Sequence, residues 1–215
     1  EIFLEASIKD KPIDAALHFA GLKSVSESLK NPFLYWDVNV GGSINLLNVM
    51  NQYNCRTIVF SSSATIYGRQ EDGSLLNENS HINPCHPYGT TKFAIEQLLS
   101  DTFYSNKETW KVVNLRYFNP IGAHYSGKIG ENPIGSPNNI FPIITNVAIG
   151  KIPKIEIFGN DWPTKDGTGV RDYIHIMDLA EGHVKALEYL RNNKAQLLNL
   201  NLGTGKGTSV LELIN

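Results

Sequence analysis

Thr57-Ile58-Val59-Phe60-Ser61 is a short apolar run that ends in serine residues, and it decides the fold. Its β-branched and aromatic residues fit a buried strand. A similar run, Val112 to Tyr117, follows after a helical stretch that begins near Tyr88. Strands that alternate with helices in this way are typical of right-handed βαβ units. The sequence therefore predicts an α/β fold with a parallel sheet.

The alternation extends toward the N-terminus, where Ala15 to Ala20 predicts another buried strand. Helical spacing then gives two apolar stripes, which are Val40, Ile44, Leu47 and Met50, and Ile95, Leu98 and Leu99. We expect the second stripe to face the core, with Glu96 and Asp101 on other faces of that helix.

After Asn119 the composition changes, because residues 122–139 are rich in Gly, Pro, Asn and Ser. We place a domain boundary near Asn119–Gly122. The elements predicted beyond it are a helix at Ile140–Ile149, a strand at Ile155–Phe158, a polar loop at Gly159–Gly169, a helix at Asp178–Leu190, a strand at Leu197–Leu202 and a helix from Ser209.

The composition disfavours several classes of protein. The 215 residues carry a net charge of −2, so nothing predicts binding to nucleic acid or to an anionic membrane. No apolar run reaches the ~18 residues needed to span a bilayer. Cys55 and Cys85 are too few for a disulfide framework and lack metal-ligand spacing. We therefore expect no metal site and a location in the reducing cytoplasm.

Tyr88-Gly89-Thr90-Thr91-Lys92 carries candidate chemistry. If Pro87 sets the first helical turn, the Cβ atoms of Tyr88 and Lys92 lie about 5–6 Å apart. A free tyrosine is a poor base at neutral pH, but a nearby ammonium favours its phenolate. The alternative is a surface Tyr and Lys on an ordinary helix.

Three polar segments follow predicted strands: Gly21-Leu22-Lys23, Ser61-Ser62-Ser63 and Phe118-Asn119-Pro120. Ligands of open α/β sheets bind beyond the carboxyl ends of the strands, so we expect Ser63 to face a ligand. The alternative for Ser63 is a hydroxyl that caps local backbone. A hydroxyl, a phenol and an amine can together remove a proton from an alcohol while a cofactor takes the hydride.

These segments belong to a longer pattern that closely resembles the UDP-glucose 4-epimerases, within the extended short-chain dehydrogenases. The pattern comprises HFAGLK (18–23), FSSSATIYG (60–68), PYGTTK (87–92), LRYFNPIGAH (115–124), IFGND (157–161), DGTGVRDYIH (166–175) and NLGTG (201–205). It runs in order from about residue 13 to the last residue.

The resemblance implies an enzyme that holds NAD tightly and interconverts UDP-glucose and UDP-galactose. Ser63 and Tyr88 would address the sugar 4-hydroxyl, with Tyr88 as the base and Lys92 bound to the nicotinamide ribose. Hydride would leave C4 for NAD, and the resulting 4-keto sugar would turn and receive it on its other face.

The resemblance also assigns binding residues. Those implied for the cofactor are Lys23, Asn39, Ser61, Tyr88, Lys92 and Phe118. Those implied for the UDP-hexose are Ser63, Asn119, Asn139, Ile140, Phe158, Arg171 and Tyr173. The guanidinium of Arg171 suits a diphosphate, although an ion pair with Asp172 is the alternative. Helix capping for Asn39, a turn for Asn139 and plain core for Phe118 also stay open.

The segment Gly203-Thr204-Gly205-Lys206-Gly207 looks like a phosphate-binding loop. Its spacing is not G-x-G-x-x-G, and we reject it as the dinucleotide site.

The resemblance begins partway through the family's cofactor domain. It implies a Rossmann-like, doubly wound NAD-binding domain that lacks its first strands over residues 1–119. Residues 120–215 would form part of a smaller α/β substrate domain, partly interwoven with the first. We expect this piece alone to bind NAD weakly and to lack activity, and the full-length enzyme to be a homodimer.

Three other functions compete with epimerisation. Related nucleotide-sugar 4,6-dehydratases carry Asp and Glu after the active-site hydroxyl residue, and the decarboxylases also tend to carry an acidic residue there. Ala64 and Thr65 occupy those positions in this chain, which argues against both reactions. A non-catalytic nucleotide-sugar binding module is the third possibility, and it would not need Ser63, Tyr88 and Lys92 together.

Overall fold

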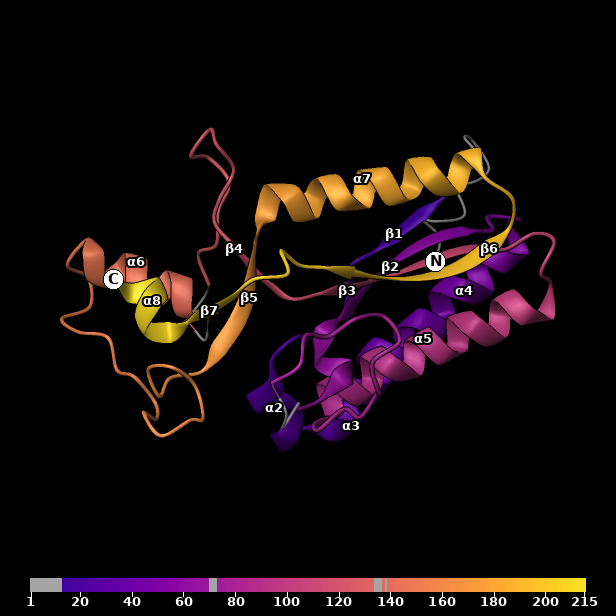
Figure 1. The fold of residues 1–215 in the computed structure, drawn as a ribbon. Coiled ribbons are helices and arrows are strands. Elements are labelled where there is room, and N and C mark those ends of the chain that lie inside the picture. The colour runs from indigo at the N-terminus through magenta and orange to yellow at the C-terminus, as the bar shows by residue number, and fades with distance from the viewer. Residues whose placement is uncertain (1–12, 70–72, 134–136, 138) are drawn as a thin grey trace. The chain divides into compact units, whose positions relative to one another are not determined.

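A computed structural model describes residues 13–69, 73–133, 137 and 139–215 of the chain (Figure 1). Its contacts divide the chain into two compact units. The first unit contains the described residues up to Tyr117 together with Gly182–Asn201, and the second contains Phe118–Glu181 and Leu202–Asn215. The chain thus leaves the first unit, returns to it and leaves it again.

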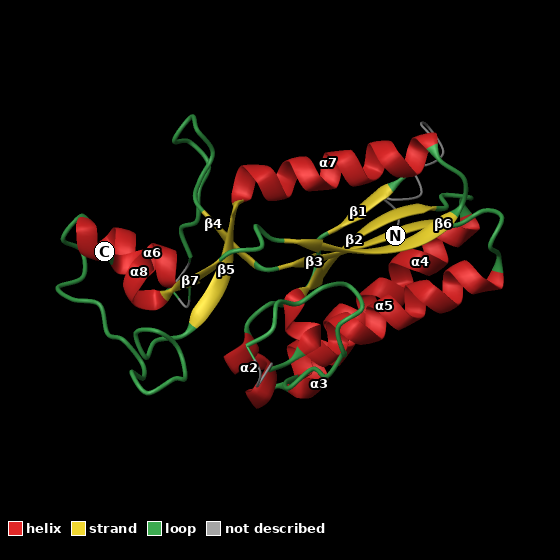
Figure 2. Cartoon of the chain, viewed as in Figure 1, coloured by secondary structure: helices red, strands yellow, loops and turns green. Residues whose placement is uncertain are grey.

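The first unit is built on a sheet in the order β1-β2-β3-β6, with helices on both faces (Figure 2). Its strands are β1 (Ala16–His18), β2 (Thr57–Ser63), β3 (Lys111–Tyr117) and β6 (Gln196–Leu202). Its helices are α2 (Val25–Lys30), α3 (Pro32–Tyr35), a π-helical segment (Trp36–Gly41), α4 (Gly42–Gln52), a 3₁₀ turn (Ala64–Tyr67), α5 (Pro87–Ser105) and most of α7 (Ile176–Asn192).

The pairing of β1, β2 and β3 is parallel. The register places His18 opposite Phe60 and Ser63 opposite Tyr117. All three strands therefore end at the same edge, which is where the predicted polar segments begin. The parallel α/β fold predicted from the sequence is confirmed.

The core of this unit lies between the sheet and helices α4 and α5. It consists of Leu47, Met50, Cys55, Ile58, Phe60, Ile95, Leu99, Trp110 and Val112. The inward positions of Leu47, Met50, Ile95 and Leu99 agree with the two predicted stripes, whereas Ile44 is 42% exposed. On the opposite face of the sheet, α7 supplies His183, whose ring contacts those of Phe19 and Tyr117.

The second unit contains a small mixed sheet in the order β4-β5-β7. Its elements are β4 (Asn119–Ile121), α6 (Ile140–Ala148), β5 (Val170–His175), β7 (Gly207–Ser209) and α8 (Val210–Ile214). Strands β4 and β5 are parallel, and β5 and β7 are antiparallel. Ser209 and Glu212 form a capping box that starts α8 at the predicted place.

Two local predictions are wrong. Residues 155–158 form no strand, and Phe158 is 87% exposed, so this alternating segment has neither a sheet partner nor a buried face. Glu96 was expected to point away from the core, but it is only 3% exposed because it pairs with Arg116. The short strands β4, β5 and β7 were not predicted, because each depends on a partner far away in the sequence. The assignment of residues 1–119 and 120–215 to cofactor and substrate domains stays a prediction.

Candidate active site

Three consecutive serines at the end of β2 each make a different bond. The Ser61 hydroxyl donates to the carbonyl of His18 (2.9 Å), and the Ser62 hydroxyl donates to Glu96 Oε1 (2.5 Å). Ser63 Oγ accepts from the amide of Thr65 (3.2 Å) and thereby caps the 3₁₀ turn. The capping alternative for Ser63 therefore holds. It does not exclude a role at the site, because a hydroxyl has further bonding capacity.

Helix α5 begins where the sequence predicts, with Pro87 in the first turn. Nδ1 of His86 accepts the amide hydrogen of Gly89 (3.0 Å) and serves as the N-cap. Burial lowers the pKa of His86, which favours the neutral ring that this acceptor role requires. The His86 ring also stacks on the Tyr88 ring, with centroids 6.0 Å apart. Sequence reasoning missed His86, although a polar residue directly before Pro at a helix start is a recognisable cap signal.

Lys92 lies one turn after Tyr88 and is only 5% exposed. Its Nζ donates to the carbonyl of Ser61 (2.7 Å) and lies 5.9 Å from the centroid of the Tyr88 ring. Burial lowers the pKa of Lys92 to about 8, which still leaves it largely protonated at neutral pH. The helix therefore holds a buried cation beside the phenol, as the spacing predicted.

The phenol of Tyr88 responds to two opposing effects. Burial raises its pKa, and hydrogen bonding with Ser63 lowers it, with burial the larger cause. Sequence reasoning considered only the favourable effect of Lys92 on the phenolate. In the folded chain the loss of hydration outweighs the hydrogen bonding with Ser63, and the pKa of Tyr88 lies above its ordinary value.

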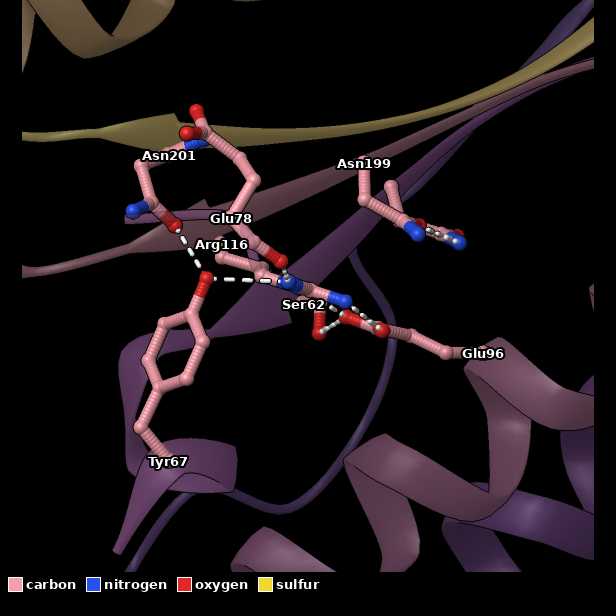
Figure 3. A network of polar contacts seen from close by, with 8 residues as sticks. Ser62, Tyr67, Glu78, Glu96, Arg116, Asn199 and Asn201 are labelled. Carbon is pink, nitrogen blue, oxygen red and sulfur yellow. Dashed lines mark hydrogen bonds and ion pairs between the residues drawn. The ribbon is translucent and has the colours of Figure 1, made fainter. Parts of the chain in front are cut away.

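A buried polar network connects the sheet with α5 (Figure 3). Arg116 on β3 pairs with Glu96 on α5 through Nε–Oε1 (3.1 Å) and Nη2–Oε2 (2.8 Å). Its Nη1 donates to the hydroxyl of Tyr67 (2.9 Å) and to the carbonyl of Glu78 (3.0 Å). Tyr67 in turn donates to Oδ1 of Asn201 on β6 (2.6 Å). One guanidinium thus joins α5, β3 and the turn that follows Ser63.

The residues implied for cofactor binding have different environments. Lys23 is exposed and Asn39 is buried. The Asn39 amide bonds to the backbone N (2.7 Å) and O (3.1 Å) of Leu22 and to Thr91 Oγ1 (3.2 Å). Asn39 therefore holds the loop after β1 in place, within a π-helical segment rather than as a helix cap.

Pairing of β4 with β5 brings together three of the residues implied for the nucleotide. Asn119 lies opposite Tyr173, and its side chain donates to the carbonyl of Asp172 (3.1 Å). Arg171 is exposed, and its Nη1 donates to the carbonyl of Val170 (2.7 Å). Burial raises the pKa of Tyr173, while the charge of Arg171 lowers it. Phe118, which directly precedes β4, donates its amide to the carbonyl of Leu202 (3.0 Å).

Three other residues implied for the nucleotide lie outside this strand pair. Asn139 precedes α6, is exposed and donates to Glu131 Oε1 (2.5 Å), while Ile140 is the first residue of the helix. Phe158 lies in the exposed loop described above.

The glycine-rich loop after β6 is already occupied by a carboxylate of the chain. Asp172 accepts from the amides of Thr204 (2.9 Å) and Gly205 (2.8 Å) and from the Thr204 hydroxyl (2.8 Å). A phosphate would need these same amides. The loop amides therefore bind the Asp172 carboxylate and not the phosphates of a dinucleotide. This use of Asp172 also argues against the alternative in which it pairs with Arg171.

Within the described residues, no helix is long and apolar enough to cross a bilayer. The same part of the chain shows no group of three or more His, Cys, Asp or Glu that could hold a metal ion.

Comparison with known proteins agrees with this geometry. The sequence model of the NAD dependent epimerase/dehydratase family matches residues 3–203. The chain belongs to this family. The resemblance to UDP-glucose 4-epimerases is confirmed, because the curated relatives include UDP-glucose 4-epimerase 2 of Arabidopsis thaliana, which is 52% identical over 211 residues. UDP-glucose 4-epimerase 4 of Oryza sativa is 51% identical over 212 residues.

Solved structures of this family share the fold. A UDP-glucose-4-epimerase from Stenotrophomonas maltophila, with bound NAD and formylated UDP-arabinopyranose, has a TM-score of 0.94 and 49% identity over 99% of the chain. An epimerase from Bifidobacterium longum, in complex with NAD+ and UDP, has a TM-score of 0.91 and 44% identity. The chain spans 60% of the Arabidopsis relative and 62% and 63% of the two solved chains.

Proposed function

We propose that the protein containing this chain is an NAD-dependent UDP-glucose 4-epimerase. It would interconvert UDP-glucose and UDP-galactose by inverting the configuration at C4 of the sugar through a transient 4-keto sugar. The names of the relatives support this reaction, and the chain carries the side chains that the reaction needs.

The convergence of Ser63, Tyr88 and Lys92 within the first unit is the observation that carries the proposal. These side chains come from the end of β2 and the first turns of α5. Hydrogen bonding between Ser63 and Tyr88 lowers the pKa of the phenol, and the buried ammonium of Lys92 lies beside the phenol ring. A sensor that only binds a nucleotide sugar has no need for such a base.

The environment of Lys92 also suits the binding of NAD. A lysine ammonium has three N–H donors, and among the hydrogen bonds of the described residues Lys92 makes one, to the carbonyl of Ser61. A buried ammonium with spare donors suits the hydroxyls of a ribose. We therefore propose that NAD binds at the carboxyl edge of the parallel sheet, with Lys92 as a ribose ligand. Lys23, Asn39, Ser61 and Phe118 are the further proposed cofactor residues.

Tyr88, Ser63 and Lys92 would have different roles in moving the proton of the sugar hydroxyl. Tyr88 accepts the proton of the sugar 4-hydroxyl and later returns it. Ser63 donates to the phenolate and offsets part of the burial that raises the pKa of Tyr88. The ammonium of Lys92, 5.9 Å from the centroid of the Tyr88 ring, would also favour the phenolate. NAD, when bound, supplies the acceptor and donor of hydride at C4.

In the second unit, we propose that Arg171, Asn119 and Tyr173 bind the nucleotide diphosphate. Their common support is the pairing of β4 with β5, which places Asn119 opposite Tyr173. Arg171 is exposed and has no ion pair with its neighbour Asp172 among the described contacts. A guanidinium of this kind suits paired charge-assisted bonds to phosphate oxygens. Asn139, Ile140 and Phe158 are proposed contacts for the rest of the nucleotide sugar.

Thr65 distinguishes this reaction from dehydration. The position that would carry an acidic residue in a dehydratase holds a hydroxyl, and that hydroxyl bonds to Ser63 (2.9 Å). Neither Thr65 nor Ala64 can exchange protons with a sugar carbon at neutral pH.

We also propose that the full-length protein is a cytoplasmic homodimer. Helices α3 and α4 and the segment between them expose large apolar side chains, including Phe33 (88%), Leu34 (44%) and Ile44 (42%). Such side chains are typical of an interface. Sedimentation of the full-length protein tests this, since a monomer at micromolar concentration contradicts it.

Tyr88→Phe separates an enzyme from a binding module. We expect turnover of UDP-galactose to fall at least about 100-fold, because removal of a positioned base typically costs that much. Binding of UDP, measured by calorimetry, should change little. Unchanged turnover would exclude Tyr88 as the base. Binding of UDP-hexose without turnover in the unsubstituted protein would instead favour the module.

A further inference from the structure

The turn that follows Ser63 contains a side-chain contact to which the proposed chemistry has assigned no role. Ser63 precedes the 3₁₀ turn Ala64–Tyr67 in an extended conformation (φ −149°, ψ 141°). Its Oγ accepts from the Thr65 amide (3.2 Å) and also from the Thr65 hydroxyl (2.9 Å). One residue thus makes two donor contacts to the same oxygen.

These two contacts leave the Ser63 hydroxyl free to act as a donor. A serine hydroxyl has two acceptor lone pairs and one hydrogen. Because Thr65 donates to both lone pairs, the remaining capacity of Ser63 is to donate. Hydrogen bonding of Ser63 with Tyr88 lowers the pKa of the phenol, as expected when a hydroxyl donates to a phenolate. The donor role that the Thr65 contacts leave to Ser63 therefore matches the effect of Ser63 on the phenol.

Contacts with the rest of the first unit hold the turn in place at its end and at its middle. At its end, Tyr67 is fully buried and bonds to Arg116 (2.9 Å) and Asn201 (2.6 Å), as Figure 3 shows. At its middle, the Thr65 carbonyl lies 3.0 Å from where a Cβ on Gly89 would be. Gly89 directly follows Tyr88, so the first turn of α5 packs against the backbone of Thr65. The Thr65 hydroxyl is therefore held in place relative to Ser63 and to the helix that carries Tyr88.

We infer that Thr65 is a positioning residue of the active site, whose hydroxyl directs the Ser63 hydrogen toward Tyr88. This inference rests on the proposed function for its catalytic meaning, but its geometric part does not depend on the substrate. The alternative is that the Thr65 hydroxyl only stabilises the turn, as the amide of the same residue already does.

Two substitutions in the full-length protein separate these roles. Thr65→Val keeps the shape and the amide donor and removes the hydroxyl, whereas Thr65→Ser keeps the hydroxyl. For Thr65→Val we expect kcat to fall about tenfold, because the contribution of one hydrogen bond corresponds to about a tenfold change in rate. The KM for UDP-galactose should change less than about threefold. Thr65→Ser should restore kcat to within about threefold of the original value.

Thr102→Val is the control, since it removes a hydroxyl bonded to the carbonyl of Leu98 (2.7 Å) on the same helix as Tyr88. It should leave kcat unchanged.

A mutant cycle with Ser63→Ala tests whether Thr65 acts through Ser63. If it does, Thr65→Val should cause no further loss of kcat in the Ser63→Ala protein. A repeated tenfold loss in that background would overturn the inference, as would a Thr65→Val protein with the original kcat.

A spectrophotometric titration provides a readout that does not need the substrate. The phenolate absorbance of Tyr88 is obtained as the difference between proteins with Tyr88 and with Tyr88→Phe. Thr65→Val should move this titration to higher pH, and Thr65→Ser should not. An unmoved titration overturns the inference. Failure of the full-length protein to epimerise UDP-galactose, together with a moved titration, would reject the proposed reaction and leave the role of Thr65 standing.

Discussion

Arg116 and Glu96 form a bidentate ion pair in the interior of the first unit, at 2% and 4% side-chain exposure. Removing one partner of a buried pair leaves an uncompensated charge, which typically costs about 3–5 kcal/mol. We therefore expect Glu96→Gln to lower the free energy of unfolding by about 3 kcal/mol or more, measured by urea denaturation.

The exposed pair Lys154–Glu156 gives a matched control. Its atoms lie 3.6 Å apart at 75% and 65% side-chain exposure. Water and salt screen such a pair, so Glu156→Gln should change stability by less than about 1 kcal/mol. Equal losses for the two substitutions would show that burial of the Arg116–Glu96 pair does not matter.

Gly89 determines how closely the start of α5 approaches the turn after Ser63. A Cβ at this position would lie 3.0 Å from the Thr65 carbonyl and 3.2 Å from Pro84 Cβ. We expect Gly89→Ala to displace Tyr88 and to lower kcat at least about tenfold, because small misplacements of catalytic groups are costly. Steady-state kinetics of the full-length protein measures this.

Gly42 is the control for that substitution, since it is helical and a Cβ there meets nothing within 4 Å. Gly42→Ala should leave kcat unchanged and should stabilise the fold by about 0.4–1 kcal/mol. Full activity of Gly89→Ala would contradict the close approach.

Lys92 should make stability depend on pH. Its pKa is about 8 in the folded chain and near its ordinary value of 10.5 when unfolded. Between these values the unfolded state binds more protons, so the contribution of Lys92 to the free energy of unfolding rises with pH. Below pH ~8 both states are protonated and the full burial penalty is present. Relative to Lys92→Met, the unsubstituted protein should gain about 2–3 kcal/mol between pH ~7 and pH ~10. Parallel urea stabilities of the two proteins over that range would contradict the burial of a charged Lys92.

Asp172 should hold the loop after β6 in its observed conformation. Its carboxylate accepts from Thr204 and Gly205, and a Cβ on Gly203 would lie 2.6 Å from Asp172 Oδ2. Asp172→Asn replaces one acceptor oxygen with a donor, which should cost about 1–3 kcal/mol. Hydrogen exchange of the Thr204 and Gly205 amides should accelerate accordingly. Unchanged exchange would show that the carboxylate does not hold the loop.

Local sequence signals predicted the elements whose own residues carry the necessary apolar pattern or helix start. The strand that ends at Ser63 has an apolar run, and α5 has Pro87 and an apolar stripe, so both were predicted close to their observed bounds. The proximity of Tyr88 and Lys92 followed from helical spacing alone.

The features that were missed depend on distant partners. The burial of Glu96 requires Arg116, twenty residues away, although a charged residue inside an apolar strand was a signal that a buried partner exists. Strand β5 forms because β4 and β7 pair with it, and neither is marked by a strong apolar run. The expected strand at residues 155–158 has the right alternation but no partner. The raised pKa of Tyr88 depends on burial, which helical spacing does not reveal.

The most direct test of the account is a product analysis with the full-length protein and UDP-galactose, without added NAD. Chromatography and mass spectrometry should show a new UDP-glucose peak of unchanged mass, which requires epimerisation at C4 and a retained cofactor. A product lighter by water or carbon dioxide, or no product at all, would contradict the proposed epimerase.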